Sequence, residues 1–112
     1  MKTTNRPDHR VLAEALRRRV LEGPGETHPA LRQAAAGSAA GGPPAEPPYD
    51  VLARQIGEAA CRTTDAQVAD VVKAAGSEKA AFEIIMAAAV AAGLFRWQHA
   101  IRALEEETDA PR

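Results

Sequence analysis

The chain contains one cysteine, Cys61, in the stretch CRTTDAQV at residues 61–68. A thiol reacts as its thiolate, so a catalytic cysteine needs a neighbouring base or cation. Arg62 follows Cys61 directly, but the stretch contains no histidine. Two interpretations are open, a reactive thiol and a small buried residue of the core. The preceding Ala59 and Ala60 favour the buried thiol, which is the commoner outcome for a free cysteine.

Three other polar side chains could line a pocket, namely Glu83, Arg96 and His99. Each has a structural alternative: Glu83 and Arg96 could form an ion pair between successive helices, and His99 could lie on a solvated face. The three histidines are far from each other and from Cys61 in sequence, so no metal-ligand spacing is present. We therefore expect no metal and no cofactor.

The candidate residues lie on or beside predicted helices, because helical periodicity runs through most of the chain. Apolar residues recur at intervals of three and four, and no stretch alternates convincingly, which predicts an all-α fold of about five to six helices. Capping residues predict where the helices begin and end. The predicted starts are Asp8, Thr27 or His28 before Pro29, Thr64 with Gln67, and Ser77. The predicted ends are Gly23, Gly76 and Gly93.

The Gly/Pro-rich stretch GSAAGGPPAEPP, residues 37–48, interrupts this periodicity. Its composition predicts a linker or a long loop. The 112 residues fit one domain. We divide the chain into an N-terminal helical arm (1–36), the linker (37–48), a helical core (49–107) and a tail (108–112).

Charge and hydropathy argue against several classes of partner. The formal net charge is −1, which favours neither nucleic acid nor an anionic membrane. The basic run Arg17–Arg19 and Arg32 support nucleic-acid binding only weakly against the acidic EEETD near the C-terminus. The longest apolar run, Ile84–Ala92, is far shorter than the ~20 residues that span a bilayer. One cysteine excludes an internal disulfide. We expect a soluble cytoplasmic protein without nucleic-acid or membrane partners.

The segment VADVVKAAGSEKAAFEIIMAAAVAAGLFRWQHAIRAL, residues 68–104, resembles the closing helices of the carboxymuconolactone decarboxylase and AhpD-like alkylhydroperoxidase superfamily. The shared pattern is a helix that ends in Ala-Gly, an acidic helix start, Phe-Glu-Ile before an alanine-rich run, and a final helix with AIRAL. The resemblance implies an AhpD-like helical bundle and, for this bacterial-type family, a homo-oligomer.

Redox members of that family carry Cys-x-x-Cys and a histidine four residues later, upstream of this segment. In an ungapped alignment Cys61 occupies the first cysteine position, Thr64 the second and Val68 the histidine. The family's acidic proton relay would fall at Tyr49 or Asp50. Thr64 cannot resolve an oxidised thiol and Val68 cannot accept a proton, so the complete redox site is absent.

The resemblance therefore favours a non-catalytic oligomerising or accessory subunit. The helix at 82–92 is apolar on nearly all sides, which is typical of a central helix or of one covered by another subunit. A trimer or hexamer would form through the helices at 78–104, and a different protein partner is also possible.

The alternative is an enzyme. It would be a peroxide-reducing protein that uses Cys61 with an external thiol, or a decarboxylase-like lyase. The candidate catalytic residues are Cys61, Glu83 and His99.

Overall fold

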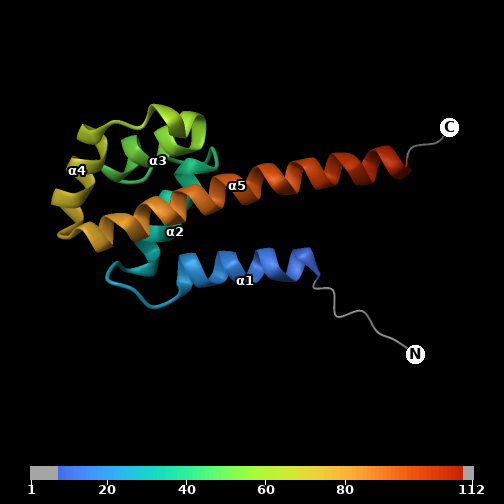
Figure 1. Ribbon diagram of the computed structural model, residues 1–112, viewed down its shortest axis with the longest axis horizontal. Coiled ribbons are helices and arrows are strands. Elements are labelled where there is room, and N and C mark those ends of the chain that lie inside the picture. The colour runs from blue at the N-terminus through green and yellow to red at the C-terminus, as the bar shows by residue number, and fades with distance from the viewer. Residues whose placement is uncertain (1–7, 110–112) are drawn as a thin grey trace.

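The computed structural model describes residues 8–109 and confirms the all-α class. Within these residues it contains five α-helices, one short 3-10 helix and no strand (Figure 1). The elements are α1 (His9–Glu22), α2 (Pro29–Ala39), α3 (Tyr49–Ala59), η1 (Ala60–Arg62), α4 (Asp65–Ala75) and α5 (Glu78–Asp109). Of the predicted tail 108–112, residues 108 and 109 complete α5, and residues 110–112 lie outside the described part.

Local capping signals fix most helix ends as predicted. The Asp8 carboxylate and the His28 ring nitrogen Nδ1 each accept the backbone N–H two residues further on, at the starts of α1 and α2. Thr64 and Gln67 form a reciprocal capping box at the start of α4. Gly76 ends α4 with a φ of 98°, a left-handed conformation that favours glycine.

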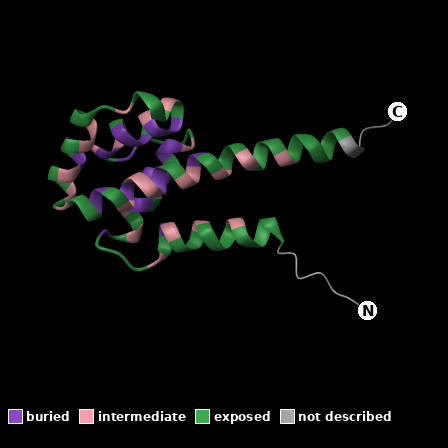
Figure 2. Ribbon diagram, viewed as in Figure 1, coloured by how far each residue is buried: buried purple, intermediate pink, exposed green. Residues whose placement is uncertain are grey.

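We define the body as α2, α3, η1, α4 and residues 78–92 of α5. In the body the N-terminal half of α5 packs against α2, α3 and α4, and the purple buried positions of Figure 2 concentrate there. Leu52, Val71 and Ile84 are its largest fully buried side chains. Most other core positions are alanine, and these small side chains let the helices approach closely.

Gly57 marks the closest approach in the body. A Cβ at this position would lie 2.0 Å from the backbone oxygen of Ala39, at the contact between α3 and α2. Only glycine fits against another backbone at this separation. The crossing of α2 and α3 therefore depends on the missing side chain.

The prediction that a helix ends at Gly93 is wrong, because α5 continues through Gly93 for 32 residues in all. Among the described glycines only Gly41 and Gly76 have a positive φ, so Gly93 stays in the helical conformation. A glycine inside a helix costs only about 1 kcal/mol relative to alanine. The apolar spacing continues through Leu94, Trp97 and Ile101, and it outweighs that cost.

Residues 37–39 complete α2, and the rest of the stretch to 48 is a loop, one of the two forms that its composition predicted, which packs partly against the core. α2 continues to Ala39, and the Gly42 N–H donates to the Gly37 carbonyl at 2.8 Å. Ala45 is buried in the core cluster. Because α2 packs against both α3 and α5, the segment assigned to an N-terminal arm (1–36) also contributes to the core.

We call α1 together with residues 93–107 of α5 the two-helix arm. In Figure 1 α1 runs antiparallel to this half of α5, and the pair extends away from the body along the longest dimension of the molecule. The principal dimensions are 54 × 35 × 22 Å. α1 contributes one buried residue, Leu21, and residues 93–107 contribute none.

Candidate functional site

The three candidate catalytic residues do not form one site. Glu83 and His99 both lie on α5, 16 residues apart, which corresponds to about 24 Å along the helix axis. Glu83 faces the loop between α1 and α2, whereas His99 lies on the arm. Cys61 belongs to η1, a different part of the body surface. The arrangement offers no thiol, acid and imidazole that could act together.

Cys61 is exposed, so the interpretation as a buried structural thiol is wrong. The helical stripe of α3 ends at Ala59, and η1 then turns away from the core. Ala60, Cys61 and Arg62 are all exposed on this turn. Thr64 is exposed too and caps α4, so the second cysteine position of the family pattern carries a structural residue.

Glu83 anchors the loop that connects α1 to α2. Its carboxylate accepts the backbone N–H groups of Glu26 and Thr27, both at 2.8 Å, and the Thr27 hydroxyl at 2.6 Å. A Cβ on Gly25 would lie 2.7 Å from the Glu83 carboxylate oxygens, so the loop backbone sits directly over the carboxylate. All three donors belong to one loop, which Glu83 therefore fixes against α5.

These contacts determine the charge state of Glu83. Burial by itself would raise the pKa of the carboxyl, but the hydrogen bonds from Thr27 and Glu26 and the nearby Arg32 outweigh it. Together they lower the pKa of Glu83 from 4.5 to about 2. Glu83 is therefore ionised at neutral pH and is a poor general acid or base.

Arg32 completes this anchor from α2. It is only 3% exposed, and its guanidinium donates to the Val20 carbonyl at 2.8 Å and to the Gly23 carbonyl at 2.6 Å. These carbonyls are at the C-terminal end of α1, where a cation suits the helix dipole. Arg32 is thus unavailable to nucleic acid and attaches α1 to α2.

Arg96 has a partner that the sequence did not indicate, whereas His99 lies on an exposed face, which was its structural alternative. Arg96 donates to the Gly57 carbonyl on α3, so it does not form the ion pair with Glu83 that was one of its two interpretations. His99 is exposed and contacts the Phe95 ring edge-on, with ring centroids 4.5 Å apart. Among the side chains that the structure describes, no group of three His, Cys, Asp or Glu could hold a metal ion.

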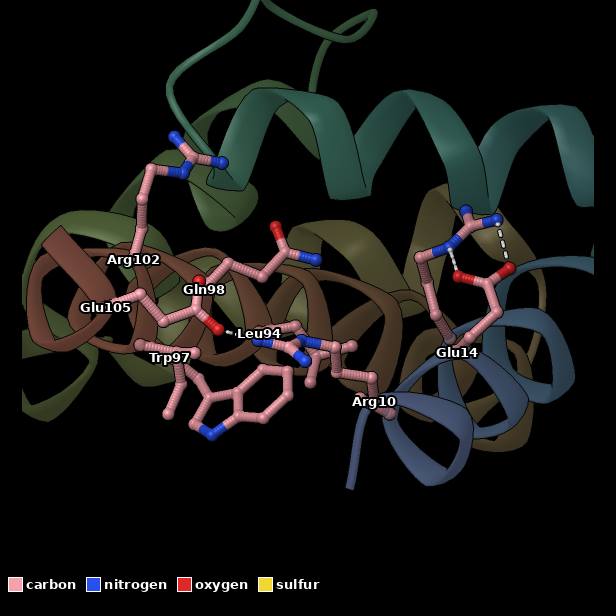
Figure 3. A pocket seen from close by; sticks show the side chains of 10 residues that line it. Arg10, Glu14, Leu94, Trp97, Gln98, Arg102 and Glu105 are labelled. Carbon is pink, nitrogen blue, oxygen red and sulfur yellow. Dashed lines mark hydrogen bonds and ion pairs between the residues drawn. The ribbon is translucent and has the colours of Figure 1, made fainter. Parts of the chain in front are cut away.

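A groove of about 340 Å³ lies between the two helices of the arm (Figure 3). An ion pair between Arg10 and Glu105 joins the helices near the tip of the arm. Arg17 hydrogen-bonds Glu14 at 3.0 and 3.1 Å, and this contact lowers the pKa of Glu14. The α5 wall includes Trp97. The groove is lined by the carboxylates of Glu14 and Glu105, both paired with arginines, and, among the described residues, by no cysteine or histidine.

Exposed apolar side chains concentrate on this arm. Of the seven large apolar side chains that are exposed among the described residues, two lie on the body, Val51 and Phe82. The other five lie on the arm: Val11, Leu12, Leu16, Phe95 and Leu104. Leu94, Trp97 and Ile101, beside the groove, are only half-buried. The sequence showed the apolar spacing of both helices. It could not show that these side chains stay exposed among the described residues.

α5 is also the one described helix that has the length and composition of a membrane span. The stretch Glu78–Glu107 covers 30 residues, its mean hydropathy reaches 1.5, and 33% of its most apolar window is buried inside the protein. This stretch is longer than the apolar run Ile84–Ala92 that the sequence suggested. The core helix of a globular protein meets the same criteria of length and composition, so these criteria are met by a membrane span and by a core helix alike.

No family model matches the chain, and no curated protein or solved structure shows significant similarity to it. The AhpD-like resemblance of residues 68–104 therefore stays a prediction from sequence.

Proposed function

We propose that the chain is a non-catalytic helical module that assembles with other copies of itself through the two-helix arm, as a scaffold or accessory subunit. The observation that carries this proposal is the cluster of exposed apolar side chains on α1 and on residues 93–107 of α5. Contiguous exposed apolar surface on a small protein is typical of an interaction site.

Energetics support the arm as the binding surface. Burial of a fully exposed leucine side chain contributes about 1.5–3 kcal/mol. Leu12 and Leu16 remain 50% and 46% exposed, and they lie one turn apart on α1. Two helices alone cannot enclose a core, whereas a second pair laid across them can.

The arm replaces the oligomer surface expected from sequence. Residues 78–92 of α5, with their apolar residues on nearly all sides, are largely covered by α1, α2, α3 and α4 within one chain. The 93–107 half of α5 contains no buried residue and is the more open of the two halves to a neighbour. Assembly as a trimer or hexamer is a prediction from the family resemblance, and the arm geometry favours pairs.

The proposal includes an AhpD-like ancestry with a lost redox site. Thr64 stands where a second cysteine would resolve the first, and it caps α4. Val68 stands at the histidine position and packs against the core cluster. At both positions a residue that supports the fold stands where the family pattern has a redox residue. This fits an accessory role.

A cytoplasmic location belongs to the same proposal. The most apolar part of α5, around Ile84–Ala92, packs against other helices of the chain. The remainder of α5 carries Arg96, Arg102 and the acidic run 105–107, and such charges are costly inside a bilayer. Detergent-free extraction of the full chain into the soluble fraction is the expected result.

Sedimentation equilibrium of the full chain and of a Leu12→Asp/Leu16→Asp variant tests the assembly. The wild type should self-associate reversibly, and the variant should be monomeric with an unchanged circular dichroism spectrum. Val51→Asp, an equally exposed apolar position on the body, is the matched control and should associate like the wild type. A wild type that is monomeric across a wide concentration range would refute the proposal.

The exposure of Cys61 favours a second candidate, a peroxide-reducing enzyme. The Cys61 thiolate would attack the hydroperoxide, break its O–O bond and become a sulfenic acid while the alcohol leaves. Two equivalents of an external thiol would then restore the thiol, with release of water and a disulfide. Peroxide consumption that needs added thiol and disappears in Cys61→Ser would establish this function, and equal turnover by both proteins would exclude it.

A further inference from the structure

We propose that the groove between the two helices of the arm binds a free alkyl carboxylate, with the alkyl chain along α5 and the carboxylate at Arg102. The site goes beyond the proposed function, because it lies within one arm and requires no second copy. None of the five exposed apolar side chains of the arm lines this groove. The ligand site and the surface for self-association are therefore separate and can be tested separately.

A change in side-chain size along α5 opens the groove. At the base of the arm Leu21 and Ala87 belong to one buried cluster, and Val20 and Ala91 pack against it. Alanine side chains are small, so the two helices approach closely there. Beyond Ala91 the apolar residues of α5 that line the groove are large: Leu94, Trp97 and Ile101. They hold α1 away from α5, which leaves a space of about 340 Å³.

The two walls of the groove differ in polarity. On α5 Leu94, Trp97 and Ile101 lie three and four residues apart and form a half-buried apolar row. The wall on α1 is mainly charged, and its four positions share one face of the helix: Arg10, Ala13, Glu14 and Arg17. The apolar row of α5 thus faces charged side chains, which cannot bury it. A molecule with an apolar body and a charged end fits between such walls.

The size of the groove fits one small molecule. The cluster that contains Leu21 bounds it at the base, and the Arg10–Glu105 ion pair crosses it near the tip (Figure 3). The apolar row from Leu94 to Ile101 is about 10 Å long, because a helix rises 1.5 Å per residue. The volume lies within the range of small-molecule pockets. It is too small for a partner helix, which is about 10 Å wide with its side chains.

The charged side chains of the groove favour an anion. Three arginines and two glutamates line it, so the lining has a net charge of +1: Arg10, Arg17, Arg102, Glu14 and Glu105. Glu105 already pairs with Arg10 across the groove. Glu14 pairs with Arg17 along α1. Within residues 8–109 Arg102 has no ion-pair partner, so its guanidinium is the one that a ligand carboxylate would pair with.

The net charge also favours a carboxylate over a phosphate. A carboxylate carries one negative charge, which matches the lining. A phosphate monoester carries close to two at neutral pH, and the two glutamates would oppose the second. An exposed ion pair contributes little to affinity. Burial of the alkyl chain against the apolar row of α5 must therefore supply most of the binding free energy.

Titration of the full chain with decanoate, below the concentration at which it forms micelles, tests the site. Trp97 is the one tryptophan of the sequence and lines the groove, so its fluorescence reports binding. The emission should change saturably, with one decanoate bound per chain. Butyrate has the same charge on a shorter chain and should leave the emission unchanged. Decyltrimethylammonium has the same alkyl chain with the opposite charge and should bind more weakly than decanoate.

Three substitutions locate the ligand. Ile101→Asp should weaken decanoate binding at least about tenfold, because it places a carboxylate in the apolar row. Arg102→Gln should weaken it roughly two- to fivefold, as expected for the loss of an exposed ion pair. Ala103→Asp adds the same charge on the same turn but does not line the groove, so this control should bind like the wild type. Circular dichroism checks that each variant keeps its helices.

Three outcomes would overturn the site. The first is Trp97 emission that shows no saturable change with decanoate, or the same change in Ile101→Asp. The second is equal binding of decanoate and decyltrimethylammonium, which would exclude recognition of the carboxylate. The third is emission that changes with protein concentration alone and no longer responds to decanoate. This result would show that a second copy covers the groove.

The variant Leu12→Asp/Leu16→Asp separates the site from the proposed function. It should lose self-association and still bind decanoate like the wild type. Loss of decanoate binding in this variant would place the ligand between two copies and overturn a site within one arm. A wild-type chain that is monomeric and binds decanoate would refute the proposed function and leave the site standing.

Discussion

The two halves of α5 differ in surroundings although they belong to one continuous helix. Residues 78–92 include six buried positions and pack inside the body: Ala80, Ala81, Ile84, Ala87, Ala88 and Ala92. Residues 93–107 include none, although Leu94, Trp97 and Ile101 continue the apolar spacing. The comparison shows that one apolar spacing can build an internal core in one half and leave an exposed apolar surface in the other. The two halves differ in the number of helices of the same chain that pack against them.

The largest expected difference in stability is between a substitution in the core and one on the arm. Ile84→Ala should lower the free energy of unfolding by about 2–5 kcal/mol, because Ile84 is fully buried and its truncation leaves a cavity. Leu16→Ala should lower it by less than about 1 kcal/mol, because Leu16 is half exposed in the monomer. Urea denaturation at low protein concentration measures both, and equal losses would show that the arm is part of the core.

Two glycine substitutions should change the stability of the chain in opposite directions. Gly57→Ala should destabilise the chain by about 1–3 kcal/mol, because its Cβ would collide with the Ala39 backbone. Gly93→Ala should stabilise it by about 1 kcal/mol, because no atom lies within 4 Å of the new Cβ and alanine favours helix. Thermal unfolding measures both, and a destabilising Gly93→Ala would contradict a continuous α5.

The anchor at the base of the arm should depend on pH. Glu83→Gln should cost roughly 2 kcal/mol at pH 7, since the Glu83 carboxylate accepts three hydrogen bonds. The folded pKa of about 2 lies below the unfolded value of 4.5, so the stabilisation is fully present above pH 4.5. It decreases as the pH falls toward 2.

Urea denaturation of both proteins from pH 7 to pH 2 measures this dependence. The difference between wild type and Glu83→Gln should shrink with acid. Glu58→Gln, at an exposed position on α3, is the control and should show little difference at any pH. A difference that grows with acid would contradict the anchor.

The smallest expected changes in stability concern Thr64 and Cys61. Thr64→Ala should cost about 1 kcal/mol, because it removes the side-chain cap of α4. Cys61→Ser should change stability by less than about 0.5 kcal/mol, because Cys61 is exposed. Chemical denaturation of both variants measures these changes. A large loss of stability in Cys61→Ser would show that the thiol is buried in the core.

Local signals made much of the fold predictable. Asp8, His28, Thr64 with Gln67, and Gly76 act through neighbours within a few residues, and each lies at a helix end in the structure. Gly93 carries the same signal as Gly76 but lies inside a helix, because the apolar spacing on both sides outweighs one glycine. Composition correctly indicated the loop that follows Ala39, but it could not show that Ala45 in this loop is buried in the core.

The site was less predictable because its contacts are distant in sequence. Glu83 bonds Thr27, 56 residues away, and Arg96 bonds Gly57, 39 residues away. No local pattern identifies such partners. The exposure of Cys61 likewise depends on where α3 ends and η1 turns, and the preceding alanines suggested the opposite. The apolar residues of the arm were visible in the sequence, but their exposure depends on which helices the fold leaves uncovered.

Hydrogen exchange measured at low and high protein concentration tests the central claim most directly, because it reports on both regions at once. Our account predicts that amides of 9–22 and 94–107 become more protected as concentration rises, while those of Ile84–Ala92 stay unchanged. The same concentration dependence should be absent in Leu12→Asp/Leu16→Asp. Protection of the arm that is independent of concentration would contradict the assignment of this surface to self-association.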